Sequence, residues 1–466
     1  MVTTQTRQNI FWVWSNAVDF QKRGDATYWL PSYTVLTKNK LQHRIADIAE
    51  LSELRFDPTD NPDGHFHYID ISNVDVLDGA YTKTLLQNAD APSRARKKLE
   101  QFDVIVSTVR PNRNATAIVL EKEKTLVGST GFAVLKPKKI NPYYLFAFTK
   151  SRYFIDQLVR NTSATMYPAV NEKDVANAKI LIPSRQQQEV IATLIVKAYQ
   201  HKQQSEADQA EAQSIFENQL KQFLPQWSQL KEPQKKVSFW LWSNEIEMTS
   251  RLNPDYYLGK GIIHELGKTL SISSFAKAKI GRTPAYDDYV ETGGRILKFR
   301  AITGAGIDWE NKERGYVKEN FFEKTQGNRI QENDIVLGSA AHQAHYIGRY
   351  IDVVDEIPKE FESGVLTVAE ILTIRVERTI NPYVLLLFLR SKVGYELIQQ
   401  QIKGQTSHLY PKDVERMVVP EVLIKISQSS FGAQIESKIK LSLRNARFCK
   451  LNIKEAVHRV EGLIVK

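Results

Sequence analysis

Cysteine is nearly absent from this sequence, and long apolar runs are absent altogether. The one cysteine, Cys449, permits no internal disulfide and excludes a cysteine-rich zinc site. No run of about 18 apolar residues occurs, so the sequence predicts no membrane span. The opening MVTTQTRQNIFWVW lacks a basic stretch followed by an apolar one, so we expect no secretory signal. These absences together predict a soluble cytosolic protein.

The motifs that accompany common enzyme chemistry are missing as well. The sequence has no GxxxxGK[ST] loop, no GxGxxG after a strand, and no HExxH, CxxC or GxSxG. Nine histidines are scattered, and the close pairs at 65 and 67 and at 342 and 345 have no further metal ligands near them in sequence. We predict a non-catalytic chain that holds no metal and no cofactor of its own.

The charge balance leaves two explanations open. There are 63 Lys and Arg against 53 Asp and Glu, a net charge of +10. A basic balance suits a polyanionic partner, because cations that neutralise phosphates release condensed counterions. On a chain of 466 residues the same charge could serve only solubility. This length also predicts several domains.

The sequence repeats itself at about half its length. FWVWSN at 11–16 returns as FWLWSN 228 residues later. LEQFDVIVSTVRPNRNATAIV (99–119) parallels IQENDIVLGSAAHQAHYIGRYI (330–351), and the segment 140–160, which begins INPYYLF, parallels INPYVLL at 380. A fixed order of matches at a nearly constant offset indicates internal duplication. We predict two diverged copies of one unit of about 230 residues.

Each copy ends in a long segment that predicts a helix, 184–224 and about 429–466. Apolar and small residues recur there at alternating spacings of four and three, the pattern of a coiled-coil seam. We expect the two segments to form an intramolecular antiparallel coiled coil, in which Cys449 is a small core residue. The alternative is two amphipathic helices packed on separate domains. The predicted seam residues are Ile191, Ile195, Ala198, Ile435, Ile439, Ala446, Cys449, Ile453 and Val460.

Between these helices each copy has mixed α/β (α+β) character. Runs rich in β-branched and aromatic residues predict strands. Asn141 and Asn381 are expected to be N-caps of the helices that follow, with proline at the first helical position. The predicted strands are 66–74, 103–109 and 131–137 in the first copy and 295–303, 334–340 and 371–377 in the second.

One loop position differs between the copies in a way that predicts DNA reading. In both copies it follows a predicted strand, and its side chains suit base edges or phosphates: Arg pairs with guanine, and Asn or Gln with adenine. Two modules reading different sequences would differ in this manner. A solvated hairpin loop that drifts freely is the alternative. The candidates are Arg110, Asn112, Arg113 and Asn114 in the first copy and His342, Gln343, His345 and Arg349 in the second.

Weaker candidates for DNA contact lie elsewhere. Arg94 and Lys97 belong to a short basic run that could contact phosphates or simply be solvated. Arg282 and Thr283 in KIGRTPAY, and Lys298 and Arg300 in ILKFRAIT, could face DNA from the second copy.

Several local patterns, in their order, resemble the DNA-specificity (S) subunits of type I restriction-modification systems. AKIGRTPAYDD (278–288) is similar to a Gly-x-Thr-Pro segment of that family. FDVIVSTVRPN (102–112) and NDIVLGSA (333–340) resemble its Gly-Asp-hydrophobic-Ser strand, with Phe102 and Asn333 in place of glycine. KDVANAKILIPSRQQQEVIATLI (173–195) resembles the segment that leads into the family's helix. The resemblance covers nearly the whole chain.

The resemblance implies a domain plan. It places a first target-recognition domain at 1–183, a spacer helix at 184–228, a second target-recognition domain at 229–422 and a second spacer helix at 423–466. The two recognition domains would form a pseudo-twofold repeat, and each would read half of a split DNA sequence. The coiled coil would fix the gap between the half-sites.

The resemblance also implies partners. Two methyltransferase subunits would dock on the helices, bring S-adenosylmethionine and flip the target adenine. Motor-nuclease subunits driven by ATP would join them. The alternative function is a coiled-coil interaction scaffold of a related defence complex without sequence-specific reading. Basic patches on both units would favour DNA reading, whereas neutral or acidic surfaces would favour the scaffold.

Overall fold

The chain forms two compact units. The computed structural model describes residues 43–162, 168–229, 266–311, 313–377, 379–404 and 407–465. Unit 1 comprises residues up to His201 together with those from Arg447 onward, and unit 2 comprises Lys202–Ala446. Unit 1 is therefore made of two stretches far apart in sequence. Both FWxWSN strings lie outside the described residues.

Unit 1 contains two four-stranded sheets. The first is antiparallel throughout, in the order β2-β9-β6-β7. The second has the order β4-β3-β8-β5, and its inner pair β3 and β8 is parallel. The first and last strands of this region in sequence, β1 and β10, form a separate short antiparallel pair. The strands are β1 His43–Arg44, β2 Ala49–Leu51, β3 His65–Ile69, β4 Thr84–Gln87, β5 Ala95–Lys98, β6 Val104–Ser107, β7 Thr116–Ile118, β8 Leu126–Ser129, β9 Phe132–Pro137 and β10 Lys179–Ile180.

Unit 2 repeats this plan. Its first sheet, β12-β20-β16-β18, has the same order and the same antiparallel pairing as the first sheet of unit 1. Its second sheet, β13-β15-β14-β19, again contains one parallel pair, β14 with β19. The strands are β11 Thr269–Ser271, β12 Ala276–Ile280, β13 Tyr289–Val290, β14 Gly294–Leu297, β15 Tyr316–Val317, β16 Ile335–Gly338, β17 Ala340–Ala341, β18 Ile351–Val353, β19 Val365–Thr367, β20 Ile371–Val376, β21 Ser407–His408 and β22 Val418–Pro420.

Two predicted strands end earlier than expected. The strand predicted at 66–74 stops at Ile69, because the Asp70 carboxylate accepts the N–H of Ile71 and the chain turns through a 3-10 helix, Ile71–Asn73. The strand predicted at 295–303 stops at Leu297 and is followed by a matching 3-10 helix, Phe299–Ala301. Aspartate favours such local side-chain-to-backbone bonds over a sheet ladder.

The helices after the sheets begin where the sequence predicts. The Asn141 side chain accepts the N–H groups of Tyr143 and Tyr144 at the start of α1, and Asn381 accepts the N–H of Tyr383 at the start of α8. Proline follows each cap, so both predicted N-caps are confirmed. The shorter helices are α1 Pro142–Thr149, α2 Arg152–Arg160, α3 Glu172–Asn177, α7 Glu319–Lys324, α8 Pro382–Arg390, α9 Lys392–Gln400, α10 Pro411–Arg416 and α11 Val422–Gln428.

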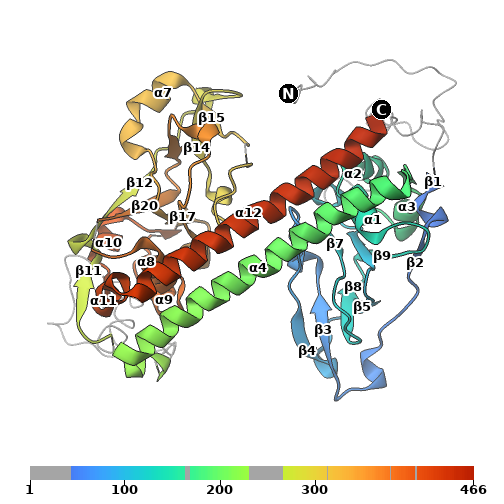
Figure 1. Ribbon diagram of the computed structural model, residues 1–466, viewed down its shortest axis with the longest axis horizontal. Helices are drawn as coiled ribbons and strands as arrows, with labels where there is room; N and C mark the ends of the chain where they lie inside the picture. Colours follow the sequence, from blue (N-terminus) through green and yellow to red (C-terminus); the bar gives the residue numbers. More distant parts are fainter. Residues whose placement is uncertain are drawn as a thin grey trace. The chain divides into compact units, whose positions relative to one another are not determined.

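Two long helices, α4 Arg185–Phe223 and α12 Ser430–Val465, contribute to both units. In unit 1 the first half of α4 shares a core with the last part of α12, where Ile195 and Ile453 are both buried. In unit 2 the second half of α4 shares a core with the first part of α12, where Phe216 and Ile439 are both buried. Within each unit the two helix segments lie side by side and run antiparallel (Figure 1). The predicted fold class, α/β units with a long antiparallel helix pair, is confirmed.

The predicted seam positions lie at or near this helix contact. All are buried except Ala446, which is half-buried. The middle of the contact is polar, within unit 2: the Ser205 hydroxyl donates to the Ser442 carbonyl at 2.8 Å, and the Ser442 hydroxyl donates to the Ser205 carbonyl at 2.8 Å. Among the described helices, none is long and apolar enough to cross a membrane.

Candidate nucleic-acid interface

The loop after β6 in unit 1 is a tight turn with two exposed polar tips. Arg110 and Asn114 both have left-handed backbone, with φ of 50° and 53°, on either side of the 3-10 helix Pro111–Arg113. Buried Pro111 anchors this turn, while Asn112 and Arg113 are exposed. The geometry therefore presents Asn112 and Arg113 to solvent on a short, constrained segment.

The other two predicted residues of this loop are less accessible. The Asn114 side-chain amide donates to the Lys150 carbonyl at 3.3 Å, and the Lys150 ammonium donates to the Asn114 carbonyl at 3.3 Å. Lys150 also donates to the Val76 carbonyl at 3.0 Å. Burial lowers the pKa of the Lys150 ammonium to about 8, opposed by the nearby carboxylates of residues 78 and 75. Asn114 thus holds the loop to the body of unit 1, and Arg110 is half-buried.

The corresponding loop of unit 2 follows β16 and runs through β17 into a 3-10 helix, Ala344–Tyr346. All four predicted residues are exposed: His342, Gln343, His345 and Arg349. Helix α9 holds the loop by its backbone, because the Gln399 amide donates to the carbonyls of Ala344 and Ile347 at 3.1 and 2.6 Å. The four predicted side chains are left to face solvent, whereas Ile347 is buried.

Three of the weaker candidates meet in unit 2. Thr283, Lys298 and Arg300 line one hollow of about 380 Å³, which we call the Lys298 hollow. The Lys298 ammonium lies 4.0 Å from the centre of the Tyr289 ring, and Arg300 is 3.9 Å from the Glu313 carboxylate. The Thr283 hydroxyl donates to the Glu370 carboxylate at 3.3 Å, which fixes an acceptor in the same hollow.

Two other basic candidates differ in their placement. Arg282 is exposed and its guanidinium lies 6.0 Å from the centre of the Phe321 ring. Arg94 is exposed on unit 1.

Lys97 requires a correction. It is only 2% exposed, and its ammonium pairs with the Glu172 carboxylate inside unit 1. Strand alternation is the reason: Ala95 and Lys97 on β5 face inward, whereas Lys98 is exposed. A phosphate contact from Lys97 does not fit this burial.

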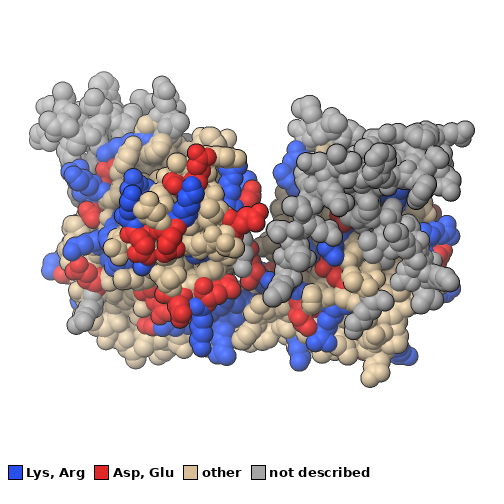
Figure 2. All heavy atoms as spheres, turned by 90° about the horizontal axis from the view of Figure 1, so that it is seen from above, with Lys and Arg blue, Asp and Glu red and all other residues tan. Residues whose placement is uncertain are grey.

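The surface charge is mixed on one face of the molecule. Figure 2 shows the described Lys and Arg side chains interspersed with Asp and Glu, without one continuous basic field. The described residues of this face therefore form no basic patch of the kind that would favour DNA reading over the interaction scaffold. In the part of the chain that the structure describes, no group of three or more His, Cys, Asp or Glu side chains could hold a metal ion.

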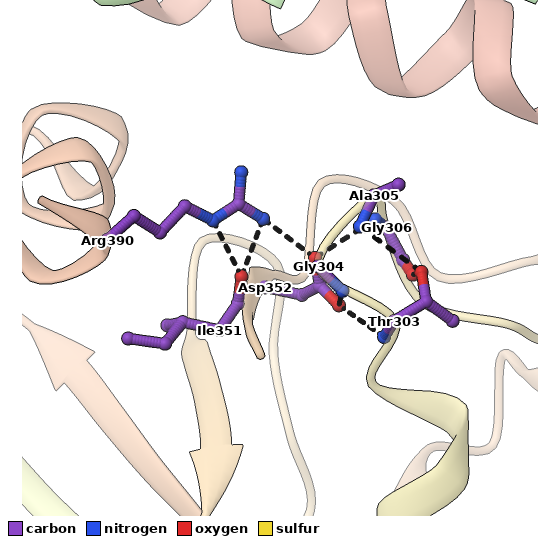
Figure 3. Close-up of polar contacts among 7 residues, drawn as sticks. All are labelled: Thr303, Gly304, Ala305, Gly306, Ile351, Asp352 and Arg390. Carbon is purple, nitrogen blue, oxygen red and sulfur yellow. Dashed lines mark hydrogen bonds and ion pairs between the residues drawn. The ribbon is translucent and has the colours of Figure 1, made fainter. Parts of the chain in front are cut away.

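Sequence reasoning missed a buried ion pair behind the second loop. Asp352, wholly buried on β18, accepts the backbone N–H groups of Thr303, Gly304 and Gly306 at 2.8 to 2.9 Å (Figure 3). The Arg390 guanidinium at the end of α8 pairs with the same carboxylate at 2.8 Å. Gly304 and Gly306 have φ of 80° and 106°. The GAG string was the only sequence signal, and glycine pairs are too common to single it out.

Further residues of the Lys298 hollow also escaped the sequence analysis. Asn311, Glu313, Arg314 and Glu370 line it. Three of them lie on a loop, and the sequence gives no periodic pattern that would place a loop beside a chosen strand. Tertiary structure alone brings them together.

The sequence is similar to known proteins over part of its length. Residues 42–212 match the family described as "Type I restriction modification DNA specificity domain". A curated relative, the type I restriction enzyme HindI specificity subunit of Haemophilus influenzae, is 25% identical over 161 residues, which are 33% of this chain and 34% of that protein. The match thus spans about a third of that relative's length.

Two S subunits are among the solved structures that match this chain at low TM-scores. The HsdS subunit from Thermoanaerobacter tengcongensis is 18% identical, with 89% of this chain and 95% of that chain covered and a TM-score of 0.33. The type I restriction-modification S subunit from M. genitalium is 13% identical, with 91% and 94% covered and a TM-score of 0.40.

Proposed function

We propose that this chain, which belongs through residues 42–212 to the type I restriction modification DNA specificity family, reads a split duplex sequence with one half-site for each unit. One observation carries the proposal. In both units the corresponding strand, β6 or β16, leads into an anchored loop with exposed polar tips, and the two loops carry different hydrogen-bonding groups. Such loops suit reading of different base edges.

The proposed contacts divide by chemistry. Asn112 and Arg113 would read bases from unit 1, and His342, Gln343, His345 and Arg349 from unit 2. Arg94 and Arg282, exposed cations outside these loops, would contact phosphates, which position a protein on DNA without reading sequence. Thr283, Lys298 and Arg300 would act from the Lys298 hollow. Arg110 and Asn114 would support the first loop.

The proposed assembly follows the predicted domain plan. Residues 1–183 and 229–422 would act as target-recognition domains, and 184–228 and 423–466 as spacer helices. The chain would itself be non-catalytic and work in the cytoplasm. Two methyltransferase subunits carrying S-adenosylmethionine would dock on the helices, and ATP-driven motor-nuclease subunits would complete the complex. Exposed apolar residues on the helices, such as Val190, Leu441 and Leu451, support a docking role.

Selection from a random duplex pool tests the proposal. The chain would be purified with its methyltransferase subunit, incubated with the pool at moderate salt, and the bound duplexes sequenced. A split motif with a constant gap is the expected result. Uniform recovery that weakens with salt would indicate non-specific binding. No recovery would contradict DNA recognition and favour the interaction scaffold.

A further inference from the structure

Unit 2 contains a buried arginine that is bound to a loop by its backbone. Arg295, on β14, is 2% exposed. Its guanidinium donates to three loop carbonyls, those of Trp309 at 3.1 Å, Asn311 at 2.8 Å and Gly315 at 3.0 Å. The rings of Tyr316 and Phe361 lie 5.4 and 5.2 Å from it. Among the described residues no carboxylate lies within ion-pair distance of Arg295.

This arrangement is costly for a residue that serves packing alone. A buried cation with no carboxylate at ion-pair distance loses its hydration and regains hydrogen bonds, ring contacts and the longer-range attraction of the carboxylates at 308, 310 and 360. Apolar residues of similar volume commonly replace buried charges without loss of stability. The three carbonyls that Arg295 binds all belong to the described residues 308–311 and 313–315 of one loop, so its principal effect is to fix the backbone of these residues.

The loop presents polar side chains to the Lys298 hollow. Trp309 is buried and lies 6.1 Å from Phe361, ring centre to ring centre, which anchors the start of the loop. Asn311, Glu313 and Arg314 then line the hollow. Arg314 has φ of 46°, and its guanidinium lies 5.4 Å from the centre of the exposed Tyr286 ring.

Unit 1 lacks both the loop and the arginine. The isolated bridge Val74↔Tyr81 in unit 1 corresponds to Ile302↔Ile307 in unit 2. The connection from this bridge to the next strand differs in length between the units. In unit 1 it consists of residues 82–83 before β4, whereas in unit 2 it consists of residues 308–315 before β15. At the position of Arg295, unit 1 has His67, whose ring instead pairs with Glu123. The longer loop and its buried arginine therefore occur together, in one unit.

We propose that residues 308–311 and 313–315, held by Arg295, are a second base-reading element of unit 2 and that the Lys298 hollow reads a G·C base pair of that unit's half-site. The inference rests on the proposed function. Guanine presents two acceptors in the major groove and its cytosine a neighbouring amino donor. The hollow offers the matching groups side by side, donors on Arg300 and Arg314 and acceptors on Glu313 and Glu370. Arg295 acts as a positioning residue, because it is buried and binds the backbone of the loop, and it does not line the hollow itself.

The test compares pool selections of variants within the complex with the methyltransferase subunit. Arg314→Ala and Glu313→Ala remove exposed hydrogen-bonding groups, and each is expected to reduce the preference for G·C at one position of unit 2's half-site by about tenfold, because a donor or acceptor to the base pair is lost. The other half-site and the gap are expected to stay the same. Lys277→Ala, which removes an exposed cation on β12, is the matched control and leaves the base frequencies unchanged.

Arg295 variants separate positioning from folding. Arg295→Met is expected to cause the same loss of G·C preference at the same position. Arg295→Lys is expected to cause a smaller loss, because its ammonium can still bind a loop carbonyl but cannot span all three. A purely structural role would instead lower the thermal midpoint and total binding without changing one base position. If Arg295→Met does not fold, the two exposed variants still decide the matter.

Failure of this inference differs from failure of the proposed function. The half-site of unit 2 is the one that Arg113→Ala leaves unaltered. If the wild-type chain selects a split motif but Arg314→Ala and Glu313→Ala select the same motif, the reading role of the loop is refuted and the proposed function stands. If the wild-type chain selects no motif, both are refuted.

Discussion

Phe102 and Asn333 occupy corresponding positions of the two units and share the same left-handed backbone, each with φ of 71°. A buried aspartate follows each of them, and its carboxylate accepts the N–H of the residue three positions earlier, Glu100 for Asp103 and Gln331 for Asp334, both at 2.8 Å. The turn is thus the same in both units despite different side chains. Its φ explains why glycine suits this position in the family that the sequence resembles.

Substitution at Asn333 is expected to report this backbone conformation. Asn333→Ala should lower the free energy of unfolding by about 1 kcal/mol, because left-handed backbone is costly for residues other than glycine and asparagine. Asn333→Gly should be neutral or stabilising. Thermal unfolding followed by circular dichroism measures both, and an equal loss for the two variants would rule out backbone strain as the cause.

The stability of unit 1 is expected to depend on pH through Asp103. Burial raises the pKa of its carboxyl to about 6, from 3.8 in the unfolded chain, partly opposed by its bond from the Glu100 N–H. The folded state therefore binds the proton more tightly than the unfolded state does. The stabilisation that Asp103 contributes is greatest below about pH 4 and is lost as the pH rises through 6.

Asp103→Asn should remove this contribution. The variant keeps an acceptor oxygen for the Glu100 N–H, so its unfolding free energy should fall less than that of the wild type between pH 4 and 6. Urea titrations at several pH values measure the difference, and parallel pH curves for the two proteins would contradict it. Asp334→Asn is a contrasting variant, because it breaks the ion pair with Arg375 at 2.7 Å and should destabilise unit 2.

The buried pair of Arg390 and Asp352 is expected to be essential for unit 2. Arg390→Met leaves the Asp352 carboxylate without its cation, and removing one partner of a buried pair costs about 3–5 kcal/mol. Arg390→Lys keeps the charge and should cost less; unit 1 has Lys150 at this position. Urea unfolding with the methyltransferase subunit absent gives the comparison. A loss of unfolding free energy below about 1 kcal/mol for Arg390→Met would show that this ion pair contributes no more to stability than a surface pair does.

Exchange of the recognition loops should change only half of the DNA target. Asn112→Ala and Arg113→Ala remove the exposed tips of the first loop, and each lost base contact should reduce discrimination at its position by about 1–3 kcal/mol. Transfer of the residues 341–349 into the place of 110–116 should alter the half-site of unit 1 alone. Sequencing of selected duplexes measures this, with Arg185→Ala on α4 as a surface control. A change in both half-sites would contradict independent reading.

Local signals in the sequence predicted much of the fold. The duplication predicted two units of one plan, and alternating spacings of four and three predicted helices at 184–224 and 429–466 that differ from α4 and α12 by about one residue at each end. The family resemblance is confirmed for residues 42–212. Caps and periodicity are read within one short segment, and repetition is read by comparing two segments of the same sequence.

Features that depend on distant partners could not be predicted in this way. The burial of Lys97 requires Glu172, 75 residues later, and a run of charged residues ordinarily indicates a solvated surface. In the sequence, Arg295 is one more cation of a predicted strand. Its partners are backbone carbonyls, which every residue has, so no residue type in the sequence indicates them. The assignments of individual DNA-contacting residues remain predictions.

The division of unit 1 into two stretches imposes an order on its folding during synthesis. Ile191, Ile195 and Ala198 pack with residues of α12 that the ribosome makes about 250 positions later. Until residues 447–465 emerge, the first unit has an uncovered apolar face, although its sheets are already complete. Unit 2 is continuous from Lys202 to Ala446 and has all of its core before the final helix ends. The unit that is begun first is therefore the one that is finished last.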